Sequence, residues 1–576
     1  MSDSLGQPAY AAIERWKQVG AELSDTHRKY LDLCRSLKAA SLQQGSHPLD
    51  LASHIDSTLG SLHTEIDQHL ALSRTALART RNELVSPLHR LPEELQSQIF
   101  LNVVISSDIW HDLEHDKPRW MEDSLKAMQR CLYNLLHVCS MWRNVILARD
   151  VFQPTVGTYG FWRPTSHHPS YTDICVSEIQ GGNLNLAVAL PLPSDFEWDA
   201  LRRHVRLFRS INILDGIHSP SFALSQELIN VFLESMPSQL AELSIYQYTT
   251  KEYSQRFMPS EKQHIVRHNS YYWTPFLEIV KSLSVLRISG EAFSLMHMAF
   301  SSRLVELRLQ NISIGYDSEF SEFLNVLSSA PELRDLKLIS LITLHDKPVP
   351  WGAIQQQQHI MLPNLQSILL EELYFNTLEL LLRWLTPGSC RLTLYLTGHS
   401  TEVLLGNSEE ETVGIEKLCS LLRPITVDTL ALSGDDPPVY TVRSLLESMP
   451  TLKSLKIQLW VLDSEGRDAL KRPEPQTTSF ESNTGVFPKL EQLHVVRLVV
   501  GHEGEKMLEE GLKDIVVSHS IQKMVLGDVY HDYLNAKGLQ GNEPICVWLR
   551  TNVPEFHLNR AFIHAPEFYS HIWQLW

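Results

Sequence analysis

The sequence predicts an α/β protein in which N-terminal helices precede a long, irregular solenoid with a parallel sheet. Three observations support this prediction. Apolar side chains recur at steps of three, four and seven residues before residue 85, which is typical of amphipathic helices. From about residue 200, helical stripes alternate with the pattern Leu-x-x-Leu-x-Leu. The chain also has 576 residues, several times the length of a typical domain.

The composition restricts the classes of partner. A formal charge of -17, with no block of Lys and Arg, argues against nucleic-acid binding. The 7 cysteines are odd in number and widely spaced, which favours reduced thiols over a disulfide framework. The sequence has neither a secretory signal pattern nor an apolar run long enough to cross a membrane. We therefore expect an intracellular protein, in cytoplasm or nucleus, with no nucleic-acid or membrane partner.

Residues 1–85 are predicted to form a helical hairpin or coiled-coil segment. Residues 45–48 (Gly-Ser-His-Pro) separate two stripes. The stripes comprise Ile13, Trp16, Leu23, Tyr30, Cys34 and Leu37, then Ile55, Leu59, Leu62, Ile66, Leu77 and Leu84. The helices could pack on each other or on the next domain. Alternatively, they could form a homodimeric coiled coil, although His69, Ser73 and Thr80 interrupt its seam.

Two short amphipathic helices are expected within residues 86–152. Pro92 suits the first position of a helix, and Glu93 and Glu94 suit its first turn. The apolar positions of this helix are Leu95, Ile99, Phe100, Val103 and Val104, and those of the second are Leu132, Leu135, Leu136, Cys139, Trp142 and Ile146. Neither helix can bury its apolar face alone, so the pair needs a third helix or a partner.

These residues resemble an F-box. The pattern is Leu91-Pro92-x-Glu94-Leu95-x-x-x-Ile99-Phe100, followed by Leu135-x-x-Val138-Cys139-x-x-Trp142-Arg143. With helices before it and a leucine-rich region after it, the chain is similar to the expanded F-box families of mushroom-forming fungi. Two features depart from the pattern. Residues 105–130 are longer than the usual connection, and Val151-Phe152 stands where the family has Leu-Trp.

The resemblance implies a three-helix module that docks on the Skp adaptor of a cullin-RING ubiquitin ligase. The adaptor contacts carried over from the family are Leu91, Pro92, Leu95, Ile99, Val138 and Trp142. An apolar anchor of this kind suits a groove on a partner. The alternative is that these side chains form only an intramolecular core.

Residues 153–545 carry the leucine-rich-repeat-like pattern. It occurs at Leu240/Leu243/Ile245, Leu283/Leu286/Ile288, Leu304/Leu307/Leu309, Leu333/Leu336/Leu338, Leu365/Ile368/Leu370, Val427/Leu430/Leu432, Leu452/Leu455/Ile457 and Leu490/Leu493/Val495, with a degenerate member at Leu392/Leu394/Leu396. Pro237, Pro331 and Pro450 are expected to end the helices that precede three of these strands. The usual asparagine is missing, since Ile312, Leu341, Leu373 and Trp460 occupy its places.

We therefore expect a divergent horseshoe with a parallel sheet on its inner face, because each helix–strand unit must stack on the next to bury its apolar side. A compact α/β domain with a few parallel strands is the alternative. Residues 345–359, 406–414 and 471–485 read as surface loops. The aromatic residues of segment 546–576 read as a C-terminal cap.

The sequence contains no motif of a catalytic or cofactor site. Phosphate-binding glycine loops, nucleophile elbows, H-E-x-x-H and C-x-x-C are all absent. His111 and His115 lack cysteines at zinc spacing, and His167 and His168 lie in a Pro/Ser loop. We expect no catalytic residues, metal or cofactor.

The function predicted from these features is that of a substrate receptor. The F-box would hold the Skp adaptor and its cullin complex, while the repeat region would hold a target protein. Polar residues that alternate with the core leucines are the candidate target contacts: Glu306, Arg308, Asp335, Lys337, Lys453 and Lys456. A leucine-rich-repeat scaffold without ligase association is the alternative, and an enzyme with an unrecognised site is a third.

Overall fold

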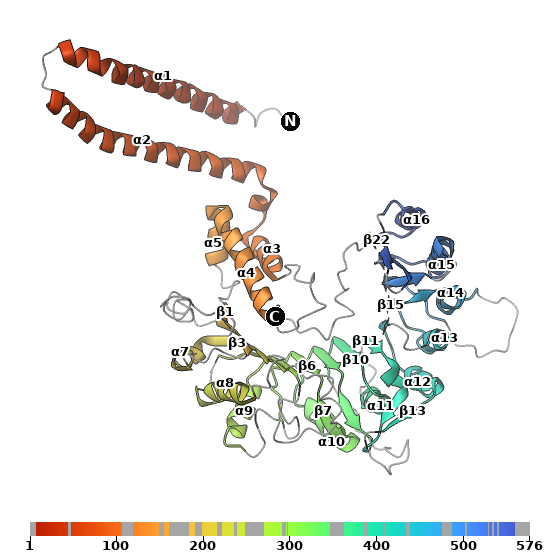
Figure 1. Cartoon of the computed structure of the whole chain (residues 1–576). Coiled ribbons are helices and arrows are strands. Elements are labelled where there is room, and N and C mark those ends of the chain that lie inside the picture. Colours follow the sequence, from red (N-terminus) through yellow and green to blue (C-terminus); the bar gives the residue numbers. More distant parts are fainter. Residues whose placement is uncertain are drawn as a thin grey trace. The chain divides into compact units, whose positions relative to one another are not determined.

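Figure 1 shows the computed structural model of the chain, which contains two compact units, Met1–Gln96 and Ser97–Trp576. The residues that it describes are 7–43, 48–105, 119–148, 155–159, 184–190, 198–215, 222–235, 239–247, 266, 270–290, 295, 298–345, 362–384, 390–407, 409–433, 438–474, 487–500, 504–527, 529–532, 535–537, 539 and 541–558.

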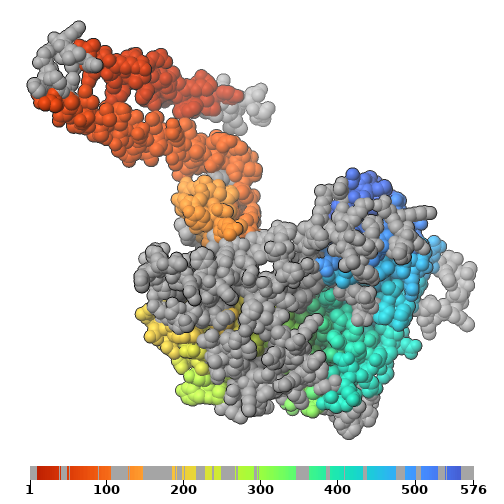
Figure 2. All heavy atoms as spheres, in the orientation of Figure 1, coloured from red at the N-terminus to blue at the C-terminus, as the bar shows by residue number. Residues whose placement is uncertain are grey.

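The first unit contains two long antiparallel helices, α1 (Gln7–Gln43) and α2 (Pro48–Val85), and the short 3-10 helix η1 (Pro87–Arg90) (Figures 1 and 2). The predicted hairpin is therefore present. The helices meet near their centres, where the Tyr30 hydroxyl lies 3.2 Å from Nε2 of His63. Most of their described side chains are exposed.

Three helices begin the next part of the chain. They are α3 (Glu93–Ile105), α4 (Arg119–Val138) and α5 (Ser140–Ala148). Residues 119–130, which the sequence analysis assigned to the long connection, belong to α4, and residues 106–118 lie outside the described part. Phe100, Val104, Leu135, Val145 and Ile146 form a small core between the helices.

A parallel sheet of 14 described strands forms the backbone of the second unit. Its strands follow one another in sequence order, so each pairs with the strands of the neighbouring repeats, as a solenoid requires. They are β1 (Thr155–Tyr159), β2 (Leu184–Leu190), β3 (Phe208–Asp215), β4 (Glu242–Gln247), β5 (Val285–Ser289), β6 (Glu306–Gln310), β8 (Asp335–Ile339), β10 (Ser367–Glu371), β11 (Arg391–Leu396), β14 (Thr429–Ser433), β15 (Ser454–Gln458), β17 (Gln492–Val496), β19 (Lys523–Leu526) and β22 (Glu555–Leu558).

Helices cover one side of this sheet, on the outside of the arc in Figure 1. They are α7 (Trp198–His204), α8 (Phe222–Ser235), α9 (Trp273–Val280), α10 (Asp317–Leu327), α11 (Phe375–Trp384), α12 (Ile415–Leu422), α13 (Val439–Ser448), α14 (Ser464–Leu470), α15 (Gly504–His519) and α16 (Pro544–Asn552); η3 (Val205–Leu207) and η5 (Gly398–Thr401) are short 3-10 helices. As predicted, α10 ends before Pro331 and α13 before Pro450, whereas Pro237 lies outside the described residues.

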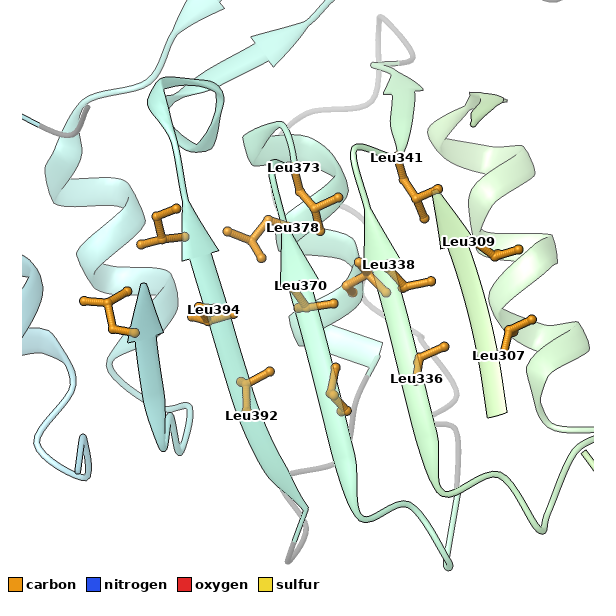
Figure 3. Packing of buried hydrophobic residues seen from close by; sticks show 14 of the residues in the cluster. Leu307, Leu309, Leu336, Leu338, Leu341, Leu370, Leu373, Leu378, Leu392 and Leu394 are labelled. Atoms are coloured by element: carbon orange, nitrogen blue, oxygen red, sulfur yellow. The ribbon is translucent and has the colours of Figure 1, made fainter. Parts of the chain in front are cut away.

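The core lies between the sheet and these helices. Leu307, Leu336, Ile368 and Leu392 are aligned in the sheet register and all are buried. Leucines from successive strands therefore form continuous rows across the repeats (Figure 3). No helix–strand unit could bury this face alone, which is why the units stack.

Short additional strands extend some repeats beyond the main sheet. They are β7 (Ser313–Tyr316) with β9 (Ile342–Leu344), β12 (Glu402–Leu404) with β13 (Glu410–Thr412), and β16 (Val461–Leu462), β18 (Leu498–Val500), β20 (Val529–Asp532) and β21 (Asn535–Lys537). The prediction of a loop over 406–414 is thus wrong for Glu410–Thr412, because these residues pair with β12.

Main-chain hydrogen bonds link the turns after the strands, in the region where the usual asparagine is missing. The residue after many of the strands has a positive φ: Gly290, Asn311, Ser340, Glu372, Leu459 and Arg497. The amide of Asn311 donates to the Ile339 carbonyl at 3.0 Å, and that of Ser340 donates to the Glu371 carbonyl at 2.9 Å. The next residue, such as Ile312 or Leu341, is buried. Main-chain bonds therefore join the turns of successive repeats here, a role that needs no particular side chain.

The predicted solenoid is confirmed, since every Leu-x-x-Leu-x-Leu motif contributes a strand to the sheet. Strands β1, β2, β3, β19 and β22 extend it beyond those motifs. Residues 544–558 add a further helix and strand, and residues 559–576 lie outside the described part. Cys175, His111, His115, His167, His168, Arg149, Val151, Phe152 and most of loops 345–359 and 471–485 also lie outside it.

Candidate interaction surfaces

Helix α3 has apolar side chains on two sides. Phe100 and Val104 are buried in the small core, whereas Leu95 is 52%, Ile99 36% and Val103 43% exposed. Leu95, Ile99 and Val103 recur at four-residue steps and so form one exposed row along the helix. This row leaves an apolar surface open to solvent, so the third helix does not cover the whole apolar surface of α3.

The Val-Cys-x-x-Trp-Arg segment joins α4 to α5. The amide of Trp142 donates to Sγ of Cys139 at 3.5 Å, and Nε of Arg143 donates to the Leu136 carbonyl at 3.1 Å. The Trp142 ring lies 4.8 Å from the ring of Phe100. These contacts cap the two helix ends and attach α5 to α3, because orphan groups at helix termini need partners outside the helix.

The six predicted adaptor contacts differ in exposure. Leu91 is half-buried and Pro92 is exposed immediately before α3, where the Pro92 carbonyl accepts from the amide of Gln96. Val138, at the end of α4, is 54% exposed, and Trp142 is half-buried. Leu91, Pro92 and Leu95 lie in the first unit, and Ile99, Val138 and Trp142 in the second.

The side of the sheet that faces away from the helices carries a charged cluster. The Arg287 guanidinium donates to both carboxylate oxygens of Glu306, at 2.8 and 2.9 Å, from neighbouring strands. Nζ of Lys337 lies 3.9 Å from Glu306. Burial would raise the pKa of Glu306, but the hydrogen bonds and charge of Arg287 outweigh it and keep the pKa below its ordinary value.

Arg308 lies on β6, the same strand as Glu306, and is deeply buried. It is 7% exposed and donates to Oε1 of Gln310 at 2.7 Å. Burial lowers its pKa to about 10, although the charge of Glu371 opposes this shift. Arg308 therefore belongs largely to the interior of the protein, and its role as a target contact stays a prediction.

The other predicted target contacts divide into two groups. Asp335, Lys337 and Lys456 are half-buried on the same side of the sheet as Glu306, and the Ser367 hydroxyl donates to Asp335. Lys453 is exposed but precedes β15, where alternation places it opposite Lys456. The sequence pattern therefore identified the polar side of the strands, whereas Lys453 lies outside β15 and its role as a target contact stays a prediction. The pattern missed Arg287, which has the same alternation.

An apolar patch lies further along this side of the sheet. Ala431 and Val496 are buried, and the half-buried ring of Tyr395 packs against them. Alternation along β11, β14 and β17 could have identified all three, because they lie opposite the leucines of their strands.

A buried polar cluster connects three repeats on the helical side. The side-chain Nδ2 of Asn376 donates to Oδ1 of Asp317 at 2.9 Å and to the Thr343 carbonyl at 3.0 Å. The Thr343 hydroxyl donates to Asp317, and Nδ1 of His345 lies 2.8 Å from its other oxygen. Each of these groups is satisfied inside the protein, so the cluster is structural.

One group of potential metal ligands occurs among the described residues. Ligand atoms of His399, Glu402 and Glu410 lie within 4.8 Å of one another. Each already has a protein partner, since His399 lies 3.0 Å from Glu402 and the Tyr374 hydroxyl donates to Glu410 at 2.8 Å. Burial, followed by the hydrogen bond to Glu410, raises the pKa of Tyr374 well above its ordinary value. These contacts account for the cluster without an ion.

No helix of the described part is both long and apolar enough to cross a membrane. No family model matches the chain, and no curated protein matches it. Among solved structures, the chain is similar to the complex of Rad7 and Elc1 in yeast, with 14% identity over 72% of this chain and 93% of that chain and a TM-score of 0.31. The assignment of the fold therefore rests on the strand order and register described above.

Proposed function

We propose that the chain is a substrate receptor of an SCF-type cullin-RING ubiquitin ligase, without catalytic residues of its own. In this proposal the segment from Leu91 to Arg143 binds a Skp-type adaptor, and the polar side of the repeat sheet binds a target protein. Ubiquitin transfer is then a matter of proximity, with the chemistry supplied by other subunits.

One observation carries the adaptor half of the proposal. The exposed row Leu95, Ile99 and Val103 lies on the helix whose other side, through Phe100 and Val104, already completes a core. The exposed row has no structural use within that core, and a cluster of apolar side chains is the usual centre of a protein interface. The resemblance of residues 91–143 to an F-box identifies the adaptor as the partner to test.

The experiment is a pulldown of the purified chain with a Skp adaptor, with binding quantified by calorimetry. Ile99→Glu places a charge in the exposed row and should reduce affinity by at least tenfold, because burying an unpaired carboxylate costs several kcal/mol. Gln98→Glu is the matched control, since Gln98 is an exposed α3 residue outside the row. Circular dichroism checks that both variants remain folded.

The outcome separates the proposal from its alternative. Adaptor binding that Ile99→Glu loses and Gln98→Glu keeps supports the receptor. If the folded wild-type chain does not bind the adaptor, the chain is better described as a repeat scaffold without ligase association.

The target half rests on the Arg287–Glu306 pair and the patch of Tyr395, Ala431 and Val496, which lie on one side of the same sheet. A polar side with an embedded aromatic residue suits a protein ligand. Crosslinking of target peptides in the presence of Glu306→Gln and Tyr395→Ala variants tests this surface. Crosslinks that remain on the helices of the solenoid in every variant would place the target elsewhere.

A further inference from the structure

We propose that the hairpin of α1 and α2 is a dimerisation element that binds the hairpin of a second copy of this chain in antiparallel orientation. The proposal is independent of adaptor binding. It rests on three properties of the hairpin: an exposed apolar seam, a segregated charge distribution, and a register that is complementary to itself.

The apolar seam is largely uncovered. On α1, Trp16 is 56% and Leu23 59% exposed, and on α2, Leu59 is 53% and Leu77 45% exposed. Only near the centre, at Tyr30, Leu62 and Ile66, are seam residues half-buried. Two helices alone cannot cover such seams, whereas four antiparallel helices can.

The seam of α2 extends along the whole helix, with the polar residues His69, Ser73 and Thr80 interrupting it as expected. At about 100° per residue, its apolar side chains lie within about 40° of one line along the helix. They are Ile55, Leu59, Leu62, Ile66, Leu70, Leu77 and Leu84. Leu70 continues the seam past His69, and Leu77 continues it past Ser73.

The charges favour a second copy as the occupant. The tip of the hairpin, residues 25–68 within the two helices, has six acidic and four basic side chains, a formal charge of −2. The base, residues 7–24 and 69–85, has five basic and three acidic side chains, a formal charge of +2. Antiparallel association places each acidic tip on a basic base, whereas parallel association places like charges together.

The register of α2 has the same symmetry. With a two-fold axis at Ile66, Ile55 lies opposite Leu77 of the second copy, and Leu62 lies opposite Leu70. Asp56 and Arg74 flank the seam on the same side, about 80° from its centre, which places each beside the other in the second copy. A two-fold dimer contains this pair twice.

The test is the mass of the full-length chain in solution, without any adaptor, measured by sedimentation over a range of concentrations. We expect a dimer of twice the 65.9 kDa chain mass. Leu59→Glu should yield monomer, whereas Leu72→Glu should not, because Leu72 is 60% exposed but lies about 120° from the seam. Circular dichroism verifies that both variants keep their helices.

Charge reversal then distinguishes a second copy from an unrelated partner helix. Asp56→Arg and Arg74→Asp should each weaken the dimer by roughly three- to tenfold, since each change occurs twice. The double variant should restore the wild-type dissociation constant. The proposal is overturned if the wild type is monomeric, whether or not the monomer binds anionic lipid vesicles through the hairpin. It is also overturned if the double variant dimerises more weakly than either single variant.

Discussion

Asn376, at the start of α11, donates a 2.9 Å hydrogen bond to Asp317, at the start of α10, although the two residues are 59 positions apart. Asp317 is 7% and Asn376 1% exposed. Together with the side chains of Thr343 and His345, which also contact Asp317, the pair links three repeats through side-chain hydrogen bonds.

Asn376→Ala should therefore destabilise the repeats. The substitution removes the bonds to Asp317 and Thr343 and leaves a buried carboxylate with fewer donors, a loss of about 1–3 kcal/mol. Thermal unfolding measures the effect. Asn325→Ala, at an exposed position of α10, is the control and should change the midpoint little. Equal midpoints for the two variants would contradict the structural role of the cluster.

Ser520→Gly should stabilise the protein. Ser520 is the exposed residue that follows α15, with a φ of 58°. Glycine adopts this left-handed conformation without strain and is the preferred residue after a helix end, so we expect a gain of about 0.5–1 kcal/mol.

The same substitution in a helix should have the opposite sign. Ser420 is exposed within α12, where glycine costs about 0.5 kcal/mol relative to serine. Chemical denaturation of both variants measures the two changes. Stabilisation by both, or by neither, would show that backbone conformation does not determine the effect.

His519 should make stability depend on pH. Its Nδ1 accepts from the Leu490 amide at 3.2 Å, so Nε2 carries the proton toward the Leu470 carbonyl at 2.9 Å. Burial lowers the pKa of His519 below 6.5. The unfolded chain then takes up this proton first as the pH falls, so the contribution is complete above pH 6.5 and is lost below it.

The measurement is the free energy of unfolding of wild type and His519→Gln between pH 8 and pH 5. Between pH 6.5 and pH 5 the free energy of unfolding of the wild type should fall more than that of the variant. His557→Gln is the control, because His557 is exposed beside Glu555 and the substitution should leave the wild-type profile intact. A variant with the same profile as wild type would remove His519 as the source.

Phe100 and Ile99 should separate stability from binding. Phe100 is 1% exposed, and Phe100→Ala should destabilise the core of α3, α4 and α5 by about 3–5 kcal/mol. Ile99→Ala should cost less than about 1 kcal/mol, because Ile99 is 36% exposed. Hydrogen exchange in α3 measures the difference. Comparable protection in both variants would mean that the two sides of α3 are packed alike.

The sequence predicted the solenoid well because strand alternation and stacking depend on local pattern. In β8, for example, Leu336 and Leu338 lie on one side of the strand, and Asp335 and Lys337 lie on the other, as predicted. Strands such as β2 were not identified, because its run LNLAVAL lacks the Leu-x-x-Leu-x-Leu spacing. A continuous apolar run does not distinguish a strand from a helix segment.

The surfaces were predicted less well, for a physical reason. Alternation indicates which side of a strand a residue occupies but not how exposed its side chain is. Arg308 and Lys337 lie on the same side of the sheet, but Arg308 is buried and Lys337 is half-buried. Similarly, the apolar pattern of α3 did not reveal that Phe100 faces a core while Ile99 does not. Exposure depends on contacts with residues far away in the sequence.

The main-chain hydrogen bonds after the strands have a consequence for how such a repeat can be traced through evolution. Glycine, asparagine, serine, glutamate, leucine and arginine all occupy the same left-handed position, and apolar residues replace the asparagine that usually marks the repeat. A turn that is joined by main-chain hydrogen bonds constrains the backbone conformation but not the amino-acid sequence. Two chains can therefore share this repeat without a common sequence signature, and only a comparison of their structures then reveals the relationship.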